Sequence, residues 1–269
     1  MIALALPRLL DLPAASRRSA SVVERNLASL RPLYWVLLLS GFVEPLLYLF
    51  SIGVGVGALV GDLTLPGGAV VSYAAFVAPA MLASSAMTGA LAETTFNFFG
   101  KMKYLKLYDG MIATPVRPFE IALGELAWAM VRGTAYSAAF LVVMVAMGLT
   151  TAGRAAVALP AAVLVGFAFG ALGMVVATLM RSWQDFDLLG SAQFTLFLFS
   201  GTFVPAEAYP AVLRWLVEVT PLYRSVHLIR GITLGEGGWS WLPDVLYLLV
   251  ATGLGLGVAA RRMQRLLYR

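Results

Sequence analysis

Six long apolar runs, separated by short polar segments, constrain the fold of this chain more than any other feature. They occupy residues 33–60, 70–95, 121–149, 155–180, 187–204 and 239–260. A helix needs about 20 mostly apolar residues to cross a bilayer. Only 12% of the residues are charged, against about 25% in soluble domains. The sequence therefore predicts an all-α polytopic membrane protein, a single domain over 1–269 with six transmembrane helices.

The basic residues indicate how this bundle is oriented. Of the 19 lysines and arginines, five precede the first run, four lie between the second and third, one follows the fourth and four follow the sixth. Four lie on the opposite side, and Arg132 lies within the third run. Because basic loops stay in the cytoplasm, we predict that both termini are cytoplasmic.

The segment 96–117 between the second and third runs carries every lysine of the chain. Its charges alternate with large apolar and aromatic side chains, which a freely solvated tether would not need. We therefore predict that this segment docks a soluble partner. The residues concerned are Lys101, Lys103, Tyr104, Leu105, Lys106, Leu107, Tyr108, Asp109 and Met111.

The segment 15–32, before the first run, has helical periodicity. Val23, Leu27, Leu30 and Tyr34 recur at intervals of four, three and four residues, with arginines elsewhere on the helical wheel. This pattern is typical of a basic amphipathic helix lying in the membrane interface. The alternative is an ordinary positively charged flank of the first span.

The region 205–238 contains two apolar pieces of about ten residues, broken at Pro210 and Pro221. Each piece is too short to span a membrane and carries charges, so an interfacial or re-entrant position is expected. We predict a re-entrant helical hairpin between the fifth and sixth spans. A plain external loop with two surface helices remains the alternative.

Four ionisable residues fall in or near the apolar runs, where charges are costly and need a partner. Arg132 lies deepest, and Glu93 is its expected partner because consecutive elements often pack together. Glu125 lies close to the cytoplasmic end and is expected to reach the interface. Glu44 precedes Pro45, which predicts a kink. A structural ion pair and a role in transport are both open readings of these charges.

Several kinds of chemistry are excluded by missing residues. There is no cysteine, and His227 is the single histidine, so thiolate and histidine-cluster metal sites are impossible. No G-x-x-x-x-G-K-[ST] phosphate loop, H-E-x-x-H or G-x-S-x-G motif is present. We therefore expect no enzymatic activity, and any ATP must be hydrolysed by another chain.

Specific segments carry a family resemblance that covers nearly the whole chain. They are EPLLYLFSIGVGVGALV (44–60), SYAAFVAPAMLASSAM (72–87), FGKMKYLKLYDGMIATPV (99–116), GELAWAMVRG (124–133), FSGTFVP (199–205) and TPLYRSVHLIRG (220–231). With these motifs in this order, the chain resembles the membrane subunit of type-2 ABC exporters of the lipooligosaccharide and nodulation-factor type. Permeases of daunorubicin-type drug exporters are similar.

The resemblance implies a six-span permease in the cytoplasmic membrane of a bacterium. It implies two cytosolic ABC ATPase subunits that bind ATP and Mg, a second permease copy as a homodimer or heterodimer, and no nucleic acid. It further implies a connecting helix over 15–32, a coupling loop over 98–116 and an outer hairpin over 205–235. The coupling residues carried over are Lys101, Lys103, Tyr104, Leu105, Leu107, Tyr108, Asp109 and Met111, and those of the outer gate are Pro205, Glu207, Arg214, Pro221, His227 and Arg230.

The expected substrate is amphipathic: a lipid-linked saccharide, a glycolipid or a hydrophobic drug. It would pass between subunits along the first, second and fifth spans. Aromatic residues there would bind acyl chains or rings, or else face lipid or the core; they are Tyr34, Trp35, Phe194, Phe197 and Phe199. Two other functions stay open: a stand-alone secondary transporter that uses Glu93 or Arg132, and a lipid-modifying membrane enzyme.

Overall fold

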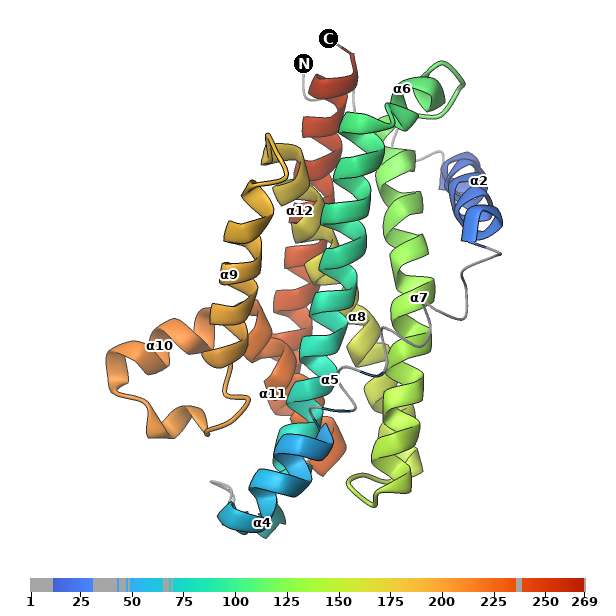
Figure 1. Ribbon diagram of the computed structural model, residues 1–269. Helices are drawn as coiled ribbons and strands as arrows, with labels where there is room; N and C mark the ends of the chain where they lie inside the picture. The colour runs from blue at the N-terminus through green and yellow to red at the C-terminus, as the bar shows by residue number, and fades with distance from the viewer. Residues whose placement is uncertain are drawn as a thin grey trace.

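Four long helices form the body of the protein (Figure 1). The computed structural model describes residues 12–30, 49–64, 70–235 and 239–268, with the single positions 43, 47 and 68. Within these residues, four helices are long and apolar enough to cross a membrane. They are the continuous helix Tyr73–Tyr104, α7 (Pro118–Ala146), α8 (Ala152–Leu179) and α12 (Leu242–Leu267). Four of the six predicted spans are thus found as helices of membrane length.

The helix Tyr73–Tyr104 is longer than the predicted run 70–95. It comprises α5 (Tyr73–Leu91) and two π-helical segments, η2 (Ala92–Asn97) and η3 (Gly100–Tyr104). Its start is set by Ser72, whose hydroxyl accepts a hydrogen bond from the Ala75 amide, as an N-cap does. Hydropathy placed the end too early, because the helix continues into the charged segment, where Lys101 pairs with a buried carboxylate.

Capping contacts also set the starts of α7 and α8. Thr151 caps α8 by accepting from the Arg154 amide. Pro118 occupies the first turn of α7, where proline is tolerated, and the Glu120 carboxylate accepts a hydrogen bond from the Arg117 amide at 2.8 Å. Since α7 and α8 are joined by a turn that passes through Gly148 at φ 71°, the two helices pack as antiparallel neighbours.

Glycines let the helices of the body approach closely. A Cβ atom on Gly170 would lie 2.5 Å from Leu126, and one on Gly173 would lie 2.4 Å from Thr94. On Gly255 of α12 it would lie 3.0 Å from the Ala171 backbone. Such small-residue contacts are typical of membrane helix packing, so Gly170, Gly173 and Gly255 mark places where α8 and α12 approach their neighbours closely.

The first and fifth predicted spans differ from the other four. The run 33–60 falls largely outside the described residues, which begin again with η1 (Leu49–Val56) and α4 (Gly57–Val60). The fifth run, 187–204, contains α9 (Asp185–Leu198), whose 14 residues rise about 21 Å. This helix is shorter than predicted, because the chain leaves it at Phe199 for a turn through Gly201 at φ 69°.

A small antiparallel hairpin precedes α5, and its second strand lies where the prediction had placed helix. Strands β1 (Asp62–Thr64) and β2 (Val70–Ser72) pair with Asp62 opposite Ser72. The turn out of α4 passes through Gly61, whose φ of 75° suits glycine. The helix therefore starts at Tyr73, three residues after the predicted start of the second run.

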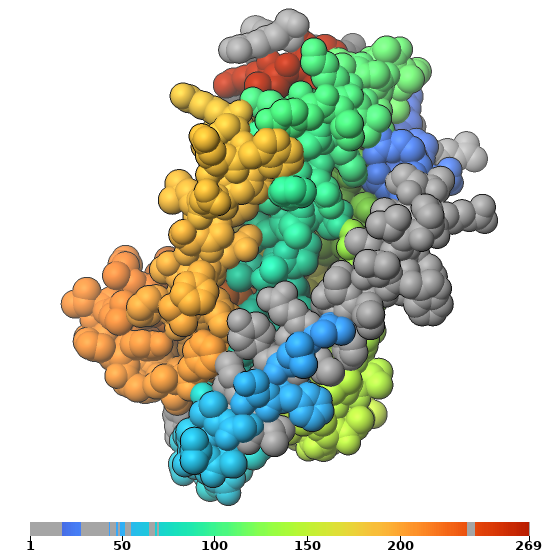
Figure 2. Space-filling view, viewed as in Figure 1, coloured from blue at the N-terminus to red at the C-terminus, as the bar shows by residue number. Residues whose placement is uncertain are grey.

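The remaining helices lie at the two ends of the body (Figure 1). At one end, here called the α6 end, are α2 (Leu12–Leu30), α6 (Leu107–Ile112) and the last turns of α12. At the opposite end, the α10 end, are α4, α10 (Ala211–Val219) and α11 (Pro221–Leu234), with the short 3₁₀ turns η4 (Ala206–Ala208) and η5 (Trp239–Trp241) in the same part of the chain. The space-filling view places α4 and the α10 hairpin at the bottom and left of the molecule (Figure 2).

Candidate functional site

A buried carboxylate joins three elements at the α6 end. Glu125 of α7 is only 5% exposed and accepts from Lys101 Nζ at 2.6 Å and from Arg25 Nη2 at 3.2 Å. Asn26 Nδ2 donates to the same carboxylate at 3.1 Å. The charge of Glu125 is therefore compensated inside the protein, and its position near the membrane interface stays a prediction. Its partners lie far away in the sequence, on α2 and on η3.

A second pair extends this contact between α2 and α7. Arg18 Nη1 lies 3.3 Å from Glu120 Oε1, and the Ser19 hydroxyl donates to the Glu120 carbonyl at 3.1 Å. Gly124 lets α2 lie directly on α7, since a Cβ there would come within 2.7 Å of Val22. Of the amphipathic segment predicted at 15–32, residues 15–30 belong to α2, whose polar side chains hold it against the body, and 31–32 lie outside the described residues.

The short helix α6 is anchored by Tyr108. This side chain is fully buried, and its ring centroid lies 5.1 Å from that of Phe98. Burial, with the Glu125 carboxylate as a second cause, raises the pKa of Tyr108 well above its usual value. Tyr108 was predicted to enter a partner's groove, but here its side chain fills the protein's own core.

The rest of the predicted docking segment is accessible at the tip of the same end. Tyr104 is 58% exposed and Leu105 is 72% exposed. Lys103 and Asp109 are exposed, whereas Leu107 and Met111 are half-buried. The chain turns sharply at Lys106, whose φ of 46° is unusual for a residue with a side chain. This turn separates η3 from α6 and leaves Tyr104 and Leu105 projecting.

An aromatic cluster that the sequence did not predict lies beside this tip. It brings the loop after α8 against the end of the long helix, with Trp183 at its centre. The members are Phe96, Phe99, Tyr104, Trp183 and Phe186. Nothing in the local pattern around Trp183 pointed to it, because all of its partners except Phe186 lie about eighty residues earlier.

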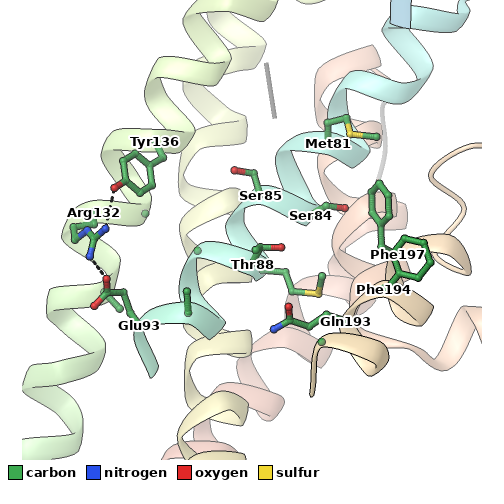
Figure 3. A pocket seen from close by; sticks show the side chains of 16 residues that line it. Met81, Ser84, Ser85, Thr88, Glu93, Arg132, Tyr136, Gln193, Phe194 and Phe197 are labelled. Carbon is green, nitrogen blue, oxygen red and sulfur yellow. Dashed lines mark hydrogen bonds and ion pairs between the residues drawn. The ribbon is translucent and has the colours of Figure 1, made fainter. Parts of the chain in front are cut away.

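Between α5, α7 and α9 lies a pocket of about 550 Å3 (Figure 3). On one wall Arg132 forms an ion pair with Glu93 and donates to the Tyr136 hydroxyl at 3.0 Å. The predicted pairing of Arg132 with Glu93 is thereby confirmed. Glu44, the fourth predicted intramembrane charge, lies outside the described residues.

Polar and apolar side chains both line the pocket, and α5 and α9 each contribute both kinds (Figure 3). Ser84, Ser85 and Thr88 of α5 and Gln193 of α9 supply polar groups, and the buried Ser84 hydroxyl has no hydrogen-bond partner among the described residues. Methionine, alanine and phenylalanine side chains supply the apolar part: Met81, Met87, Ala92, Ala129, Phe194 and Phe197.

The aromatic residues predicted to contact substrate divide into three groups. Phe194 and Phe197 line the pocket. Phe199 does not, and its ring lies 6.4 Å from that of Tyr209 instead. Tyr34 and Trp35 lie outside the described residues.

At the α10 end, α11 is fastened to the body by charged side chains. Asp244 of α12 is fully buried; its carboxylate lies 2.5 Å from His227 Nδ1 and 3.2 Å from Arg224 Nη1. Arg230 donates to the Phe76 and Gly201 carbonyls and lies 3.8 Å from the Phe76 ring centroid. The sequence did not predict an anchoring role for Asp244 or Arg224.

The other predicted gate residues have local roles in this arrangement. Arg214 pairs with Glu218 one turn along α10 at 2.7 Å. Pro221 starts α11, and Pro205 immediately precedes η4, in which Glu207 is exposed. Within the described residues, the structure thus places His227 and Arg230 in anchoring contacts and leaves Glu207 and Arg214 at the surface.

The chain was compared with known proteins. The family model described as ABC-2 type transporter matches residues 22–234. Nodulation protein J of Rhizobium leguminosarum bv. trifolii is 36% identical over 259 residues, which cover 94% of this chain and 97% of that protein. Nodulation protein J of Rhizobium leguminosarum bv. viciae is 33% identical over 226 residues, covering 84% of this chain and 85% of that protein. The chain therefore belongs to the ABC-2 type transporter family and is a membrane subunit of a transporter, not an enzyme.

Proposed function

We propose that this chain is the permease subunit of an ATP-driven exporter that moves an amphipathic substrate outward across a bacterial cytoplasmic membrane. Two cytosolic ABC ATPase subunits, which bind ATP and Mg, would drive it, and a second permease copy would complete the path. The observation that carries the proposal is the accessible Tyr104–Leu105 tip at the α6 end, together with membership of the family.

In this proposal the α6 end faces the cytoplasm. The support is the strong excess of lysine and arginine in the segments at that end. The chain then crosses the membrane six times, with the run 33–60 as the first span and α9 as part of the fifth. Both termini are cytoplasmic, and α2 is the connecting helix at the interface.

The segment 98–116 is the coupling loop in this proposal. Tyr104 and Leu105 would enter a groove on the ATPase, with Lys103 and Asp109 beside them. Lys101 and Tyr108 would act from inside the permease, since one is paired with Glu125 and the other is buried. This arrangement gives the loop an exposed contact and a rigid base, which a coupling element requires.

The pocket between α5, α7 and α9 is the proposed contact for substrate. Glu93 and Arg132 compensate each other's charge, so the pocket favours polar groups without a large net charge. The free Ser84 hydroxyl and the amide of Gln193 can bind a polar head, and Phe194 and Phe197 can bind an apolar part. An amphipathic molecule satisfies both the polar and the apolar side chains of this lining.

The hairpin of α10 and α11 is the proposed outer gate. On α10, apolar side chains remain exposed within this chain, including Val212, Trp215, Leu216 and Val219. Water would oppose such exposure, whereas hydrocarbon or a second permease copy would favour it. We therefore place α10 at membrane depth, re-entering from the outer face.

The proposal is tested with the permease and a neighbouring ABC ATPase purified together and reconstituted in vesicles. We expect ATP-dependent substrate movement and substrate-stimulated hydrolysis, both lost in Leu105→Glu. Leu59→Glu, the same change at an exposed leucine of α4 at the opposite end, should still assemble with the ATPase. Substrate movement driven by a proton gradient with no ATPase present would favour the secondary transporter instead.

A further inference from the structure

The helix α9 is weakly held along its length. None of its 14 residues is buried, whereas half of the residues of α8 are. In Figure 1, α9 stands to one side of the body, next to α5. A helix with so little burial is free to move as a unit unless its ends are fastened.

The end of α9 nearest the α6 end is fastened by Trp183. The Trp183 ring stacks on Tyr104 with centroids 5.2 Å apart and planes at 18°. It also lies 4.7 Å from Phe96, 5.2 Å from Phe99 and 5.3 Å from Phe186. These separations lie in the range in which aromatic rings attract one another. One side chain therefore joins the accessible tip to the start of α9.

The loop that carries Trp183 is rigid. The Asp185 carboxylate accepts from the Arg181 amide at 2.6 Å and from the Ser182 amide at 3.3 Å. These backbone hydrogen bonds lower the pKa of Asp185, and they close the turn around the ionised carboxylate. The Phe186 amide donates to the Trp183 carbonyl at 3.2 Å, which continues the turn into α9.

We propose that Trp183 is a positioning residue that passes motion of the 98–116 loop to α9. The inference rests on the proposed function and adds a second cytoplasmic loop, 180–186, to the coupling path. When the ATPase displaces Tyr104, the stacked Trp183 moves with it, and the rigid turn at Asp185 carries the start of α9 along. Because α9 forms one wall of the pocket, this motion changes the width of the pocket.

The first test is Trp183→Ala in the reconstituted complex with its ATPase. We expect the complex to assemble and to hydrolyse ATP. The amount of substrate moved per ATP should fall about tenfold, because the variant loses several aromatic ring contacts. Trp183→Phe, which keeps a ring, should recover most of the coupling. Tyr268→Ala, an exposed aromatic residue at the end of α12, is the matched control and should couple normally.

The second test replaces the ring contact with a covalent one. The chain has no cysteine, so Phe96→Cys with Trp183→Cys, which leaves Tyr104 in place, can be bridged by a short bis-methanethiosulfonate reagent. We expect the reduced double variant to be uncoupled and the bridged one to move substrate again. Normal coupling of Trp183→Ala, or an inactive bridged variant that recovers on reduction, would overturn the proposal.

The two proposals fail in different ways. If wild-type chain with its ATPase moves no substrate in response to ATP, the proposed function fails. If wild type transports and Trp183→Ala transports equally well per ATP, only the role of Trp183 fails.

Discussion

At the residue scale, charges inside the protein are compensated in pairs and small networks. Glu125 faces two cations and an amide, and Asp244 faces an arginine and a histidine. Removing one member of such a group leaves the other buried without a partner, which destabilises a protein strongly. Each carboxylate can therefore be neutralised separately, and the change in stability measures how much its network contributes to helix packing.

Glu125→Gln should lower the free energy of unfolding by about 2–3 kcal/mol. This loss is below the 3–5 kcal/mol typical of a broken buried pair, because Arg25 and Lys101 are partly exposed and screened by solvent. The measurement is the thermal midpoint of the purified chain in detergent. Glu207→Gln, at an exposed carboxylate, is the control, and equal midpoints for both variants would contradict the network.

Exchanging the charges of Glu93 and Arg132 should separate a structural role from a role in transport. Each single neutralisation should destabilise the chain, and a double-mutant cycle should give a coupling of about 1–3 kcal/mol. The exchanged pair should recover most of the stability but not the transport, since its charges then face the pocket differently. Purely additive stabilities would show that the pair does not interact.

Some of these residues could be paired from the sequence, and others could not. Glu93 and Arg132 could be, because a cation in hydrocarbon needs a carboxylate and consecutive helices pack together. Arg25 and Glu125 lie 100 residues apart. The aromatic rings of Phe96, Phe99 and Tyr104, which contact Trp183, precede it by about eighty residues. Such contacts depend on tertiary packing, for which periodicity carries no signal.

At the element scale, hydropathy predicted which helices exist but not where they end. The second run was expected to stop at 95, yet the helix continues to Tyr104, because Lys101 reaches the Glu125 carboxylate. Similarly, 70–72 forms a strand rather than helix because it pairs with 62–64. Ends are decided by single caps and ion pairs, whereas a hydropathy window averages over many residues.

Close packing of α8 against its neighbours predicts a large effect from one methyl group. Gly173→Ala would place Cβ 2.4 Å from Thr94 Oγ1 and 3.0 Å from Leu91, and overpacking of this kind costs about 1–3 kcal/mol. Gly257→Ala has open space around its Cβ and should be neutral. Thermal midpoints of both variants in detergent provide the check, and a neutral Gly173→Ala would contradict the packing described.

At the scale of the whole molecule, the two ends carry different chemistry. The α6 end has the basic segments, the projecting tip and the aromatic cluster, and the α10 end has the hairpin held by Asp244 and Arg230. The pocket lies between them, bordered by the lightly buried α9. In the proposed mechanism, the ATPase acts at the α6 end, and the path for substrate opens toward the α10 end.

The most direct test of this account is the accessibility of position 105. In the cysteine-free chain, Leu105→Cys should react with a membrane-impermeant maleimide only in inside-out vesicles, and bound ATPase should slow the reaction. Glu207→Cys, near the α10 end, should react only in right-side-out vesicles. Labelling of position 105 from outside the cell, or labelling unaffected by the ATPase, would contradict the claim that this tip is a cytoplasmic docking site.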